Sequence, residues 1–241
     1  MRWWTTRAGG ASKPIICNCS EFIAVVRLFT VLALLIMCAC PVLARGNKAG
    51  VFDYYVLSLS WSPSFCGTPA GKDSPTQCAP GRRFAFVVHG LWPQFKVGWP
   101  DFCETQESWV PEKQITVMMD LMPSRTLIIH EWRKHGSCSG LSQADYFGAI
   151  RSLREELRIP ARYLSPTAEI RTTPQQLIRD FVLSNKNLTA EMISVQCGNA
   201  RDTARLSEFR ICLDRKGVFT PCGRNEAKHC RAKQLIMPEV K

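Results

Sequence analysis

The sequence predicts a single α+β domain, with an antiparallel-rich central sheet and helices packed alongside it. Aromatic and β-branched residues, partly alternating with polar ones, are concentrated at Phe52–Trp61, and apolar and polar residues alternate at Phe209–Leu213; both patterns are typical of strands. Apolar residues recur at helical spacing between positions 142 and 182. Eight of the 12 cysteines fall in the segment 66–230. An even set behind a secretion signal predicts four disulfides.

The composition is that of a folded, basic protein. The chain has 241 residues, 46% of them hydrophobic and 21% charged, with a formal net charge of +11. Its length allows one sizeable core, and the apolar content argues against disorder. A basic balance suits a polyanionic partner such as nucleic acid, although it does not identify one.

Residues 1–44 are expected to form a cleaved signal peptide. Arg27 precedes an apolar run, and Val42-Leu43-Ala44 supplies small or modest residues at the cleavage positions. The run has about sixteen residues, which is short for a membrane span. An uncleaved anchor is the alternative. We therefore expect a secreted or periplasmic domain at 45–241, without stable membrane association.

Two strands are expected near the start of this domain. The first, Phe52–Trp61, ends at Ser62-Pro63, and a loop rich in Gly, Pro and Ser follows. The second is expected at Phe84–His89, because Gly90 and Pro93 interrupt the apolar run there. This strand would deliver His89 to its end.

The remaining elements are mostly helical. In chain order, a short helix is expected at 117–122, and a second helix follows 127–129. A third helix opens with a capping-box pattern at 142–145 and ends before Pro160, and a fourth opens with Thr173-Pro174. A strand is expected at 209–213, and the turn 214–217 folds it into a hairpin.

One short stretch, 130–138, concentrates groups that can do chemistry. Within six positions it holds His130, Glu131, Arg133, Lys134 and His135. If the stretch is helical, Glu131, Lys134 and His135 share one face. A base, an acid and a fixed cation on one face suit proton exchange at an anionic centre. A solvated helix face is the alternative explanation.

Three of the four histidines lie in this stretch or in a second one, 86–94, where His89 precedes Trp92. A histidine at a strand end is, taken alone, more often a satisfied polar group than a catalytic one. The zinc-protease motif needs histidines four residues apart. His130 and His135 are five apart, roughly 140° around a helix, so no metal site is expected.

The two stretches resemble the paired signatures of the ribonuclease T2 family. His89-Gly90-Leu91-Trp92-Pro93 matches one signature, and 130–138 matches His-Glu-Trp-x-Lys-His-Gly-x-Cys; the resemblance extends more weakly from about Phe52 to Cys230. It implies a ribonuclease T2-like fold and a monomeric endoribonuclease that needs neither metal nor cofactor. Such an enzyme cuts single-stranded RNA by transphosphorylation through 2′,3′-cyclic phosphates.

The resemblance also implies roles for individual residues. His135 would be the general base and His89 the general acid of cleavage, and the roles would reverse when the cyclic phosphate is hydrolysed. Glu131 and Lys134 would orient the histidines and support the charged phosphorane. His130 would hold a phosphate oxygen. The residues alone do not decide which histidine is the acid.

Three further positions bear on base recognition. Trp92 matches a tryptophan that stacks on a base, with simple packing as the alternative. Gln94 stands where some members carry an acidic residue that reads the base. Leu127 stands where several members have an aromatic residue that stacks on the second base. These departures predict broad base specificity.

The family framework implies four disulfides, although eight cysteines allow 105 pairings. The implied pairs are Cys66–Cys78, Cys103–Cys138, Cys197–Cys230 and Cys212–Cys222. The pair from Cys103 to Cys138 would fasten the loop after the first signature to the end of the second.

Two other functions compete with this interpretation. One is a catalytically inactive protein of the same fold that binds RNA or another polyanion; the intact His89, Glu131, Lys134 and His135 argue against it. The other is an unrelated secreted hydrolase, such as a metalloenzyme, which a chelator would inhibit.

Overall fold

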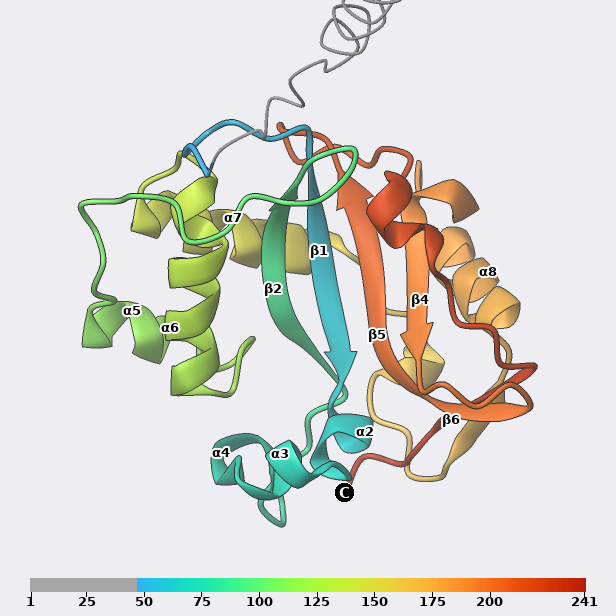
Figure 1. Ribbon diagram of the computed structural model, residues 1–241. Helices are drawn as coiled ribbons and strands as arrows, with labels where there is room; N and C mark the ends of the chain where they lie inside the picture. Colours follow the sequence, from blue (N-terminus) through green and yellow to red (C-terminus); the bar gives the residue numbers. More distant parts are fainter. Residues whose placement is uncertain (1–46) are drawn as a thin grey trace, which may run out of the picture. The chain divides into compact units, whose positions relative to one another are not determined.

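A six-stranded sheet forms the centre of the computed structural model, which describes residues 47–241 (Figure 1). The strand order is β2-β1-β5-β6-β3, and β4 pairs with β5 outside this path. The strands are β1 (Tyr54–Trp61), β2 (Phe86–Gln94), β3 (Ile170–Thr172), β4 (Ile193–Cys197), β5 (Thr203–Leu213) and β6 (Gln234–Met237). Only the β5–β6 pair is parallel among these described strands. The predicted α+β fold class is confirmed, whereas the predicted signal peptide lies outside the described residues.

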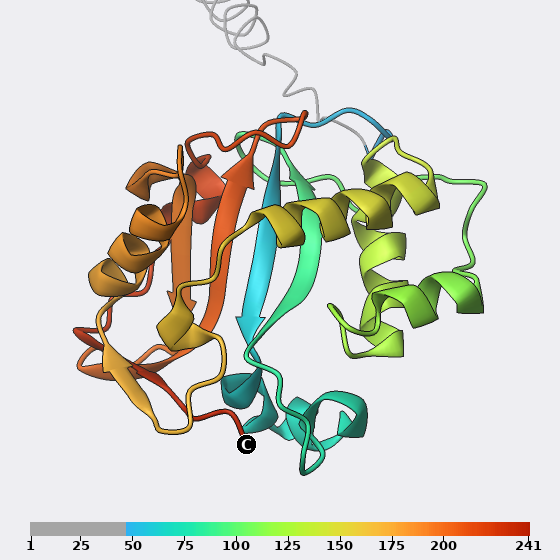
Figure 2. The ribbon, with the colours of Figure 1, turned by 180° about the vertical axis from the view of Figure 1, so that it is seen from behind.

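Helices cover one face of the sheet, lie beside its β2 edge, and gather at the end of the sheet where β1 finishes (Figures 1 and 2). They are α2 (Ser62–Cys66), α3 (Pro69–Lys72), α4 (Pro75–Cys78), α5 (Glu112–Met118), α6 (Arg125–Lys134), α7 (Gln143–Glu156) and α8 (Pro174–Ser184), with 3₁₀ turns at Gly136–Cys138, Ala161–Tyr163, Ala190–Met192 and Arg224–Ala227. Figure 2 shows α7 and α8 lying across one face of the sheet. On the other face, seen in Figure 1, the segment 224–227 crosses in front of the strands. None of the helices in residues 47–241 combines the length and apolar character of a membrane span.

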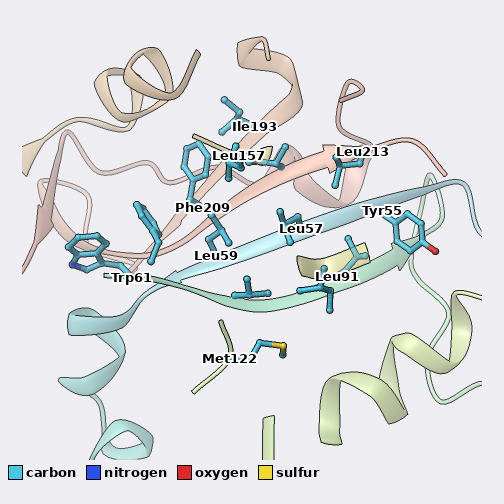
Figure 3. Close-up of a cluster of buried hydrophobic side chains, with 14 of the residues drawn as sticks. Tyr55, Leu57, Leu59, Trp61, Leu91, Met122, Leu157, Ile193, Phe209 and Leu213 are labelled. Atoms are coloured by element: carbon cyan, nitrogen blue, oxygen red, sulfur yellow. The ribbon is translucent and has the colours of Figure 1, made fainter. Parts of the chain in front are cut away.

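The hydrophobic core lies between the sheet and the pair α7 and α8. Leu57, Leu59 and Phe209 are fully buried on the sheet side (Figure 3). Phe181 of α8 stacks on Phe209 with ring centroids 3.9 Å apart. Burying each such side chain stabilises the fold by about 1.5–3 kcal/mol. The opposite face of the same strands carries the polar side chains of Ser58, Glu208 and Arg210 beside a smaller buried cluster of Tyr54, Val56 and Cys212.

The second strand is longer than predicted. β2 runs from Phe86 to Gln94, through Gly90 and Pro93, so His89 lies inside the strand and not at its end. The expectation failed because β2 is an edge strand. A proline is tolerated there, since on the open side of the sheet no backbone N–H is needed for a hydrogen bond to a neighbouring strand. Gly90 adjoins an irregularity in the β1–β2 pairing, which is a usual place for glycine within a strand.

Several helix boundaries also differ from prediction. The short helix expected at 117–122 is α5, which covers 112–118. The histidine helix, α6, ends at Lys134, and His135 is its C-cap residue with φ −116°. The loop expected between Cys66 and Cys78 contains α3 and α4, which begin at Pro69 and Pro75, a favoured first position.

Four disulfides join the cysteines in the pairs that the resemblance implies: Cys66–Cys78, Cys103–Cys138, Cys197–Cys230 and Cys212–Cys222. The Cys103–Cys138 bond ties the loop after β2 to the turn after α6. A hydrogen bond from the Phe102 N–H to the Lys134 carbonyl, 2.9 Å long, reinforces this connection. The two predicted signatures are thus held together by covalent and backbone links.

The predicted capping motif of α7 is present and gives a stability test. Ser142 Oγ accepts a 3.1 Å hydrogen bond from the Asp145 N–H and donates one of 2.6 Å to the Asp145 carboxylate. Ser142→Ala should lower the free energy of unfolding by about 1 kcal/mol, as measured by chemical denaturation. Ser152→Ala, an exposed change within the same helix, is the control and should stay within about 0.5 kcal/mol of the parent protein.

Candidate active site

A β-bulge brings His89 onto the polar face of the sheet. Ser58 pairs with Gly90 and Leu59 with Val88, so His89 is the extra residue between two registered pairs. A bulge of this kind redirects a side chain, and such bulges are common beside active sites. His89 Nδ1 lies 2.6 Å from Oε1 of Glu208 on β5. The histidine is therefore held across the width of β1 and remains 34% exposed.

Glu208 and Arg210, for which the sequence indicated no role, complete this contact. They lie two residues apart on β5 and so on the same face. Arg210 Nε and Nη2 donate to Glu208 Oε2 at 2.8 and 2.6 Å. Burial alone would raise the pKa of Glu208, but the hydrogen bond from His89 and the charges of His89 and Arg210 hold it at about 2. Glu208 is thus a fixed anion that orients His89.

Glu131 is a buried carboxylate that lies over Gly90. Its Oε2 accepts a 2.7 Å hydrogen bond from Trp92 Nε1, and its Oε1 is 3.7 Å from His89 Nε2. A Cβ at position 90 would lie 1.9 Å from Glu131 Oε2, so this approach requires glycine. Burial raises the pKa of Glu131 to about 7, against the opposing effects of His89, Trp92 and Lys134.

His135 occupies a buried position just after α6. Its side chain packs beside Trp92, with ring centroids 5.5 Å apart, and the residue is 7% exposed. Its Nδ1 is buried without a hydrogen-bond partner among residues 47–241. Burial lowers the pKa of His135 to about 3, and the nearby positive charges of Lys134, His130 and His89 act in the same direction. His135 is therefore neutral over a wide pH range.

His89 has the opposite electrostatic environment. Burial lowers its pKa, but the hydrogen bond to Glu208 and the charges of Glu208 and Glu131 outweigh burial and raise the pKa above its ordinary value. The site thus pairs a histidine that favours its protonated form with one that favours its neutral form.

Lys134 and His130 border this pair from the last turns of α6. Lys134 is half-buried, and its charge lowers the pKa of both Glu131 and His135. His130 is exposed, and its pKa is lowered by partial burial and by the charges of Lys134 and His89. His89, His130 and Leu127 line a cleft of about 510 Å³ beside the two histidine-bearing elements.

The other two predicted base-binding residues are engaged within the protein. Trp92 is half-buried, its ring contacts the Arg210 guanidinium at 5.0 Å, and its N–H is bonded to Glu131. Gln94 is buried, and its Oε1 accepts a 2.9 Å hydrogen bond from Asn225 Nδ2. Their contacts with a base stay predictions.

Phe102 is a further residue beside the site for which the sequence indicated no role. Its side chain is 59% exposed, its backbone has φ +48°, and its ring lies 6.4 Å from that of His130. An aromatic residue between the two signatures is a weak indication of function in a sequence, because aromatic side chains also serve in packing.

The alternation of Glu208 and Arg210 with apolar residues did indicate that they share a face of a strand, but it did not indicate which strand would pair with theirs. Within the described residues, no cluster of three or more His, Cys, Asp or Glu side chains is suited to hold a metal ion.

Comparisons with known proteins agree with this geometry. A family model described as the ribonuclease T2 family matches residues 52–222. A ribonuclease of Aeromonas hydrophila is 38% identical over 187 residues, which cover 73% of this chain and 77% of that protein. A probable ribonuclease of Haemophilus influenzae is 36% identical over 192 residues, which cover 75% of this chain and 64% of that protein.

Solved structures show the same fold. The self-incompatibility associated SF11-RNase of Nicotiana alata superposes with a TM-score of 0.61 at 18% identity, covering 78% of this chain and all of that one (100%). An RNase-related protein from Calystegia sepium gives a TM-score of 0.60 at 21% identity, covering 79% of this chain and 98% of that one.

Proposed function

Because the chain belongs to the ribonuclease T2 family, it is a T2-type endoribonuclease, and we propose that it cuts single-stranded RNA without a metal ion, through a 2′,3′-cyclic phosphate. The observation that carries this mechanism is the opposed environment of the two histidines. His135 is buried near cations and has a pKa lowered to about 3, whereas the contact with Glu208 raises the pKa of His89.

In the proposed reaction, His135 accepts the proton of the RNA 2′-hydroxyl as this oxygen attacks the neighbouring phosphorus. The bond from phosphorus to the 5′-oxygen breaks, and His89 donates a proton to that leaving oxygen. Since Glu208 engages Nδ1 of His89, Nε2 is the nitrogen that serves the leaving group. In the second step His89 removes a proton from water, and His135 returns its proton to the 2′-oxygen.

Lys134, Glu131 and His130 support the charge of the phosphorane in this proposal. The fixed cation of Lys134 stabilises the equatorial oxygens. Glu131, with a pKa raised to about 7, lies 3.7 Å from His89 and can hold or release a proton beside it at mild pH. His130 is exposed next to the same centre and would bind a phosphate oxygen.

The cleft next to His89 supports the proposed substrate class. Leu127 lines it, and Phe102 offers an exposed ring beside His130, so unpaired bases have apolar surfaces on which to rest. Trp92 and Gln94 would contribute to the same recognition. Four disulfides suit an oxidising compartment, so we propose that the enzyme is secreted or periplasmic. We also propose that it acts as a monomer.

The acid and base assignment can be tested through Glu208. Glu208→Gln removes the charge that raises the pKa of His89, so this pKa falls. An acid catalyst is lost as pH rises through its pKa; the alkaline limb of the kcat profile should therefore move to lower pH, while the acidic limb stays in place. Glu156→Gln, an exposed change on α7, is the control. A shift of the acidic limb instead would assign the base role to His89.

A further inference from the structure

A second concave surface lies at the hairpin that connects β4 and β5. This hairpin pocket has a volume of about 440 Å³ and is lined by the segments 196–201 and 228–231. None of its lining residues is a carboxylate. Four of them carry basic or imidazole side chains, namely Arg201, Lys228, His229 and Arg231. All four are exposed. The pocket therefore presents concentrated positive charge to solvent.

The backbone that carries these side chains is fixed by several links. The Cys197–Cys230 disulfide joins the two lining segments. Gln196 Nε2 donates a 2.9 Å hydrogen bond to the Lys228 carbonyl, and the Cys230 N–H donates one of 2.7 Å to the Val195 carbonyl. A site held in place before binding loses less conformational entropy when a ligand arrives.

The positive charge of the pocket is not neutralised within the described residues. Arg201, Lys228 and Arg231 form no salt bridge there, and the nearest acidic residue in sequence, Asp202, pairs with Lys233 at 3.0 Å. The carboxylate of Glu226 is buried and bonded to the Tyr54 hydroxyl. The cations are thus available to an external anion.

The pocket lies on the same sheet as the candidate active site, two strands away from β1. Gln196 of β4 pairs with Glu208 of β5, and Glu208 contacts His89. Neighbouring strands are about 4.8 Å apart, so the three spacings from β4 to β2, which bears His89, amount to roughly 14 Å. The segment that bears Lys228 crosses the face not covered by α7 and α8, as Ser194 Oγ bonded to the Glu226 carbonyl also indicates (Figure 1).

We propose that the hairpin pocket binds backbone phosphates of the RNA substrate at nucleotides beyond the scissile one. This inference rests on the proposed function, because a strand held at His89 and His135 can extend across β5 to the pocket. Cations that neutralise phosphates release bound counterions, which adds affinity without base preference. The pocket would favour long RNA over short fragments.

The double variant Lys228→Ala/Arg231→Ala tests the proposal. The probe is a long single-stranded 2′-O-methyl RNA, which has no 2′-hydroxyl to attack, so binding is measured whether or not the enzyme cleaves RNA. Kd should rise several-fold. The slope of log affinity against log salt should become less steep by about 1.4, because each lost phosphate contact contributes about 0.7 for a single strand.

A matched control removes the same total charge from the other side of the sheet. Arg158 and Lys186 are exposed residues that follow α7 and α8, and Arg158→Ala/Lys186→Ala should leave the salt slope unchanged. On unmodified RNA, the KM advantage of a long strand over a dinucleotide should shrink only in the pocket variant. Parental affinity and salt slope in a folded pocket variant would overturn the inference. A parent protein that does not cut RNA, but loses affinity and salt slope in the pocket variant as expected, would overturn the proposed function and leave the pocket as a site for RNA phosphates.

Discussion

Replacing either His135 or His89 by alanine is expected to lower kcat for RNA cleavage by about 10²–10⁴-fold, the usual contribution of a positioned acid or base. The two side chains have opposed electrostatic environments and separate positions, because Glu208 holds His89 while His135 is buried beside Trp92, so one histidine cannot substitute for a missing partner within a step. Initial rates on single-stranded RNA measure the effect.

Both histidine variants should keep the fold, so the loss of activity can be separated from unfolding. Four disulfides and the core between the sheet, α7 and α8 do not depend on either imidazole. Retained disulfides and a cooperative unfolding transition provide the check. Parental kcat in either folded variant would contradict the assignment of that histidine.

Lys134→Ala is expected to lower kcat by about 10²–10³-fold, with a smaller change in KM. The loss of one preorganised group that stabilises developing charge has an effect of this size. The charge of Lys134 already influences the pKa of Glu131 and His135, so the same ammonium is close to the reacting groups. Lys134→Arg should retain part of the activity because it keeps the positive charge. It should not restore full activity, since the guanidinium lacks the compact shape of the ammonium.

Arg133→Ala is the matched control for the lysine variant. Arg133 is the neighbouring cation on α6, but it is exposed and its Nε is bonded to the Ser108 carbonyl. It should change kcat little. An equal loss in the Arg133 and Lys134 variants would show that general attraction of RNA, and not local charge stabilisation, explains the effect.

Local sequence patterns correctly predicted the elements whose formation depends on residues that are close together in the sequence. β1, the cap of α7 at Ser142 and the start of α8 at Thr173 are confirmed. β2 was predicted too short, because Gly90 and Pro93 interrupt strands in general but are tolerated at a bulge on a sheet edge. The short strands β3, β4 and β6 depend on distant partners, which periodicity does not reveal.

The candidate site shows the same difference: features set by residues close in sequence were predicted, and contacts between distant residues were not. Both signatures were visible in the sequence, and the structure brings His89, Glu131 and His135 together. The partner of His89 was not visible, since Glu208 is 119 residues away and becomes its neighbour only through the order β2-β1-β5. His135 was expected on the face of a helix that ends one residue earlier, so its burial could not be foreseen.

The most direct test of the proposed mechanism is to incubate the oxidised protein with single-stranded RNA in excess EDTA and to analyse the product ends. The pairing of His135 as base with His89 as acid predicts 2′,3′-cyclic phosphate ends and no cleavage of single-stranded DNA of the same sequence, which lacks the attacking hydroxyl. Intact RNA with a folded protein would contradict the mechanism and favour a polyanion-binding protein. Cleavage that EDTA abolishes would point to a metal-dependent hydrolase.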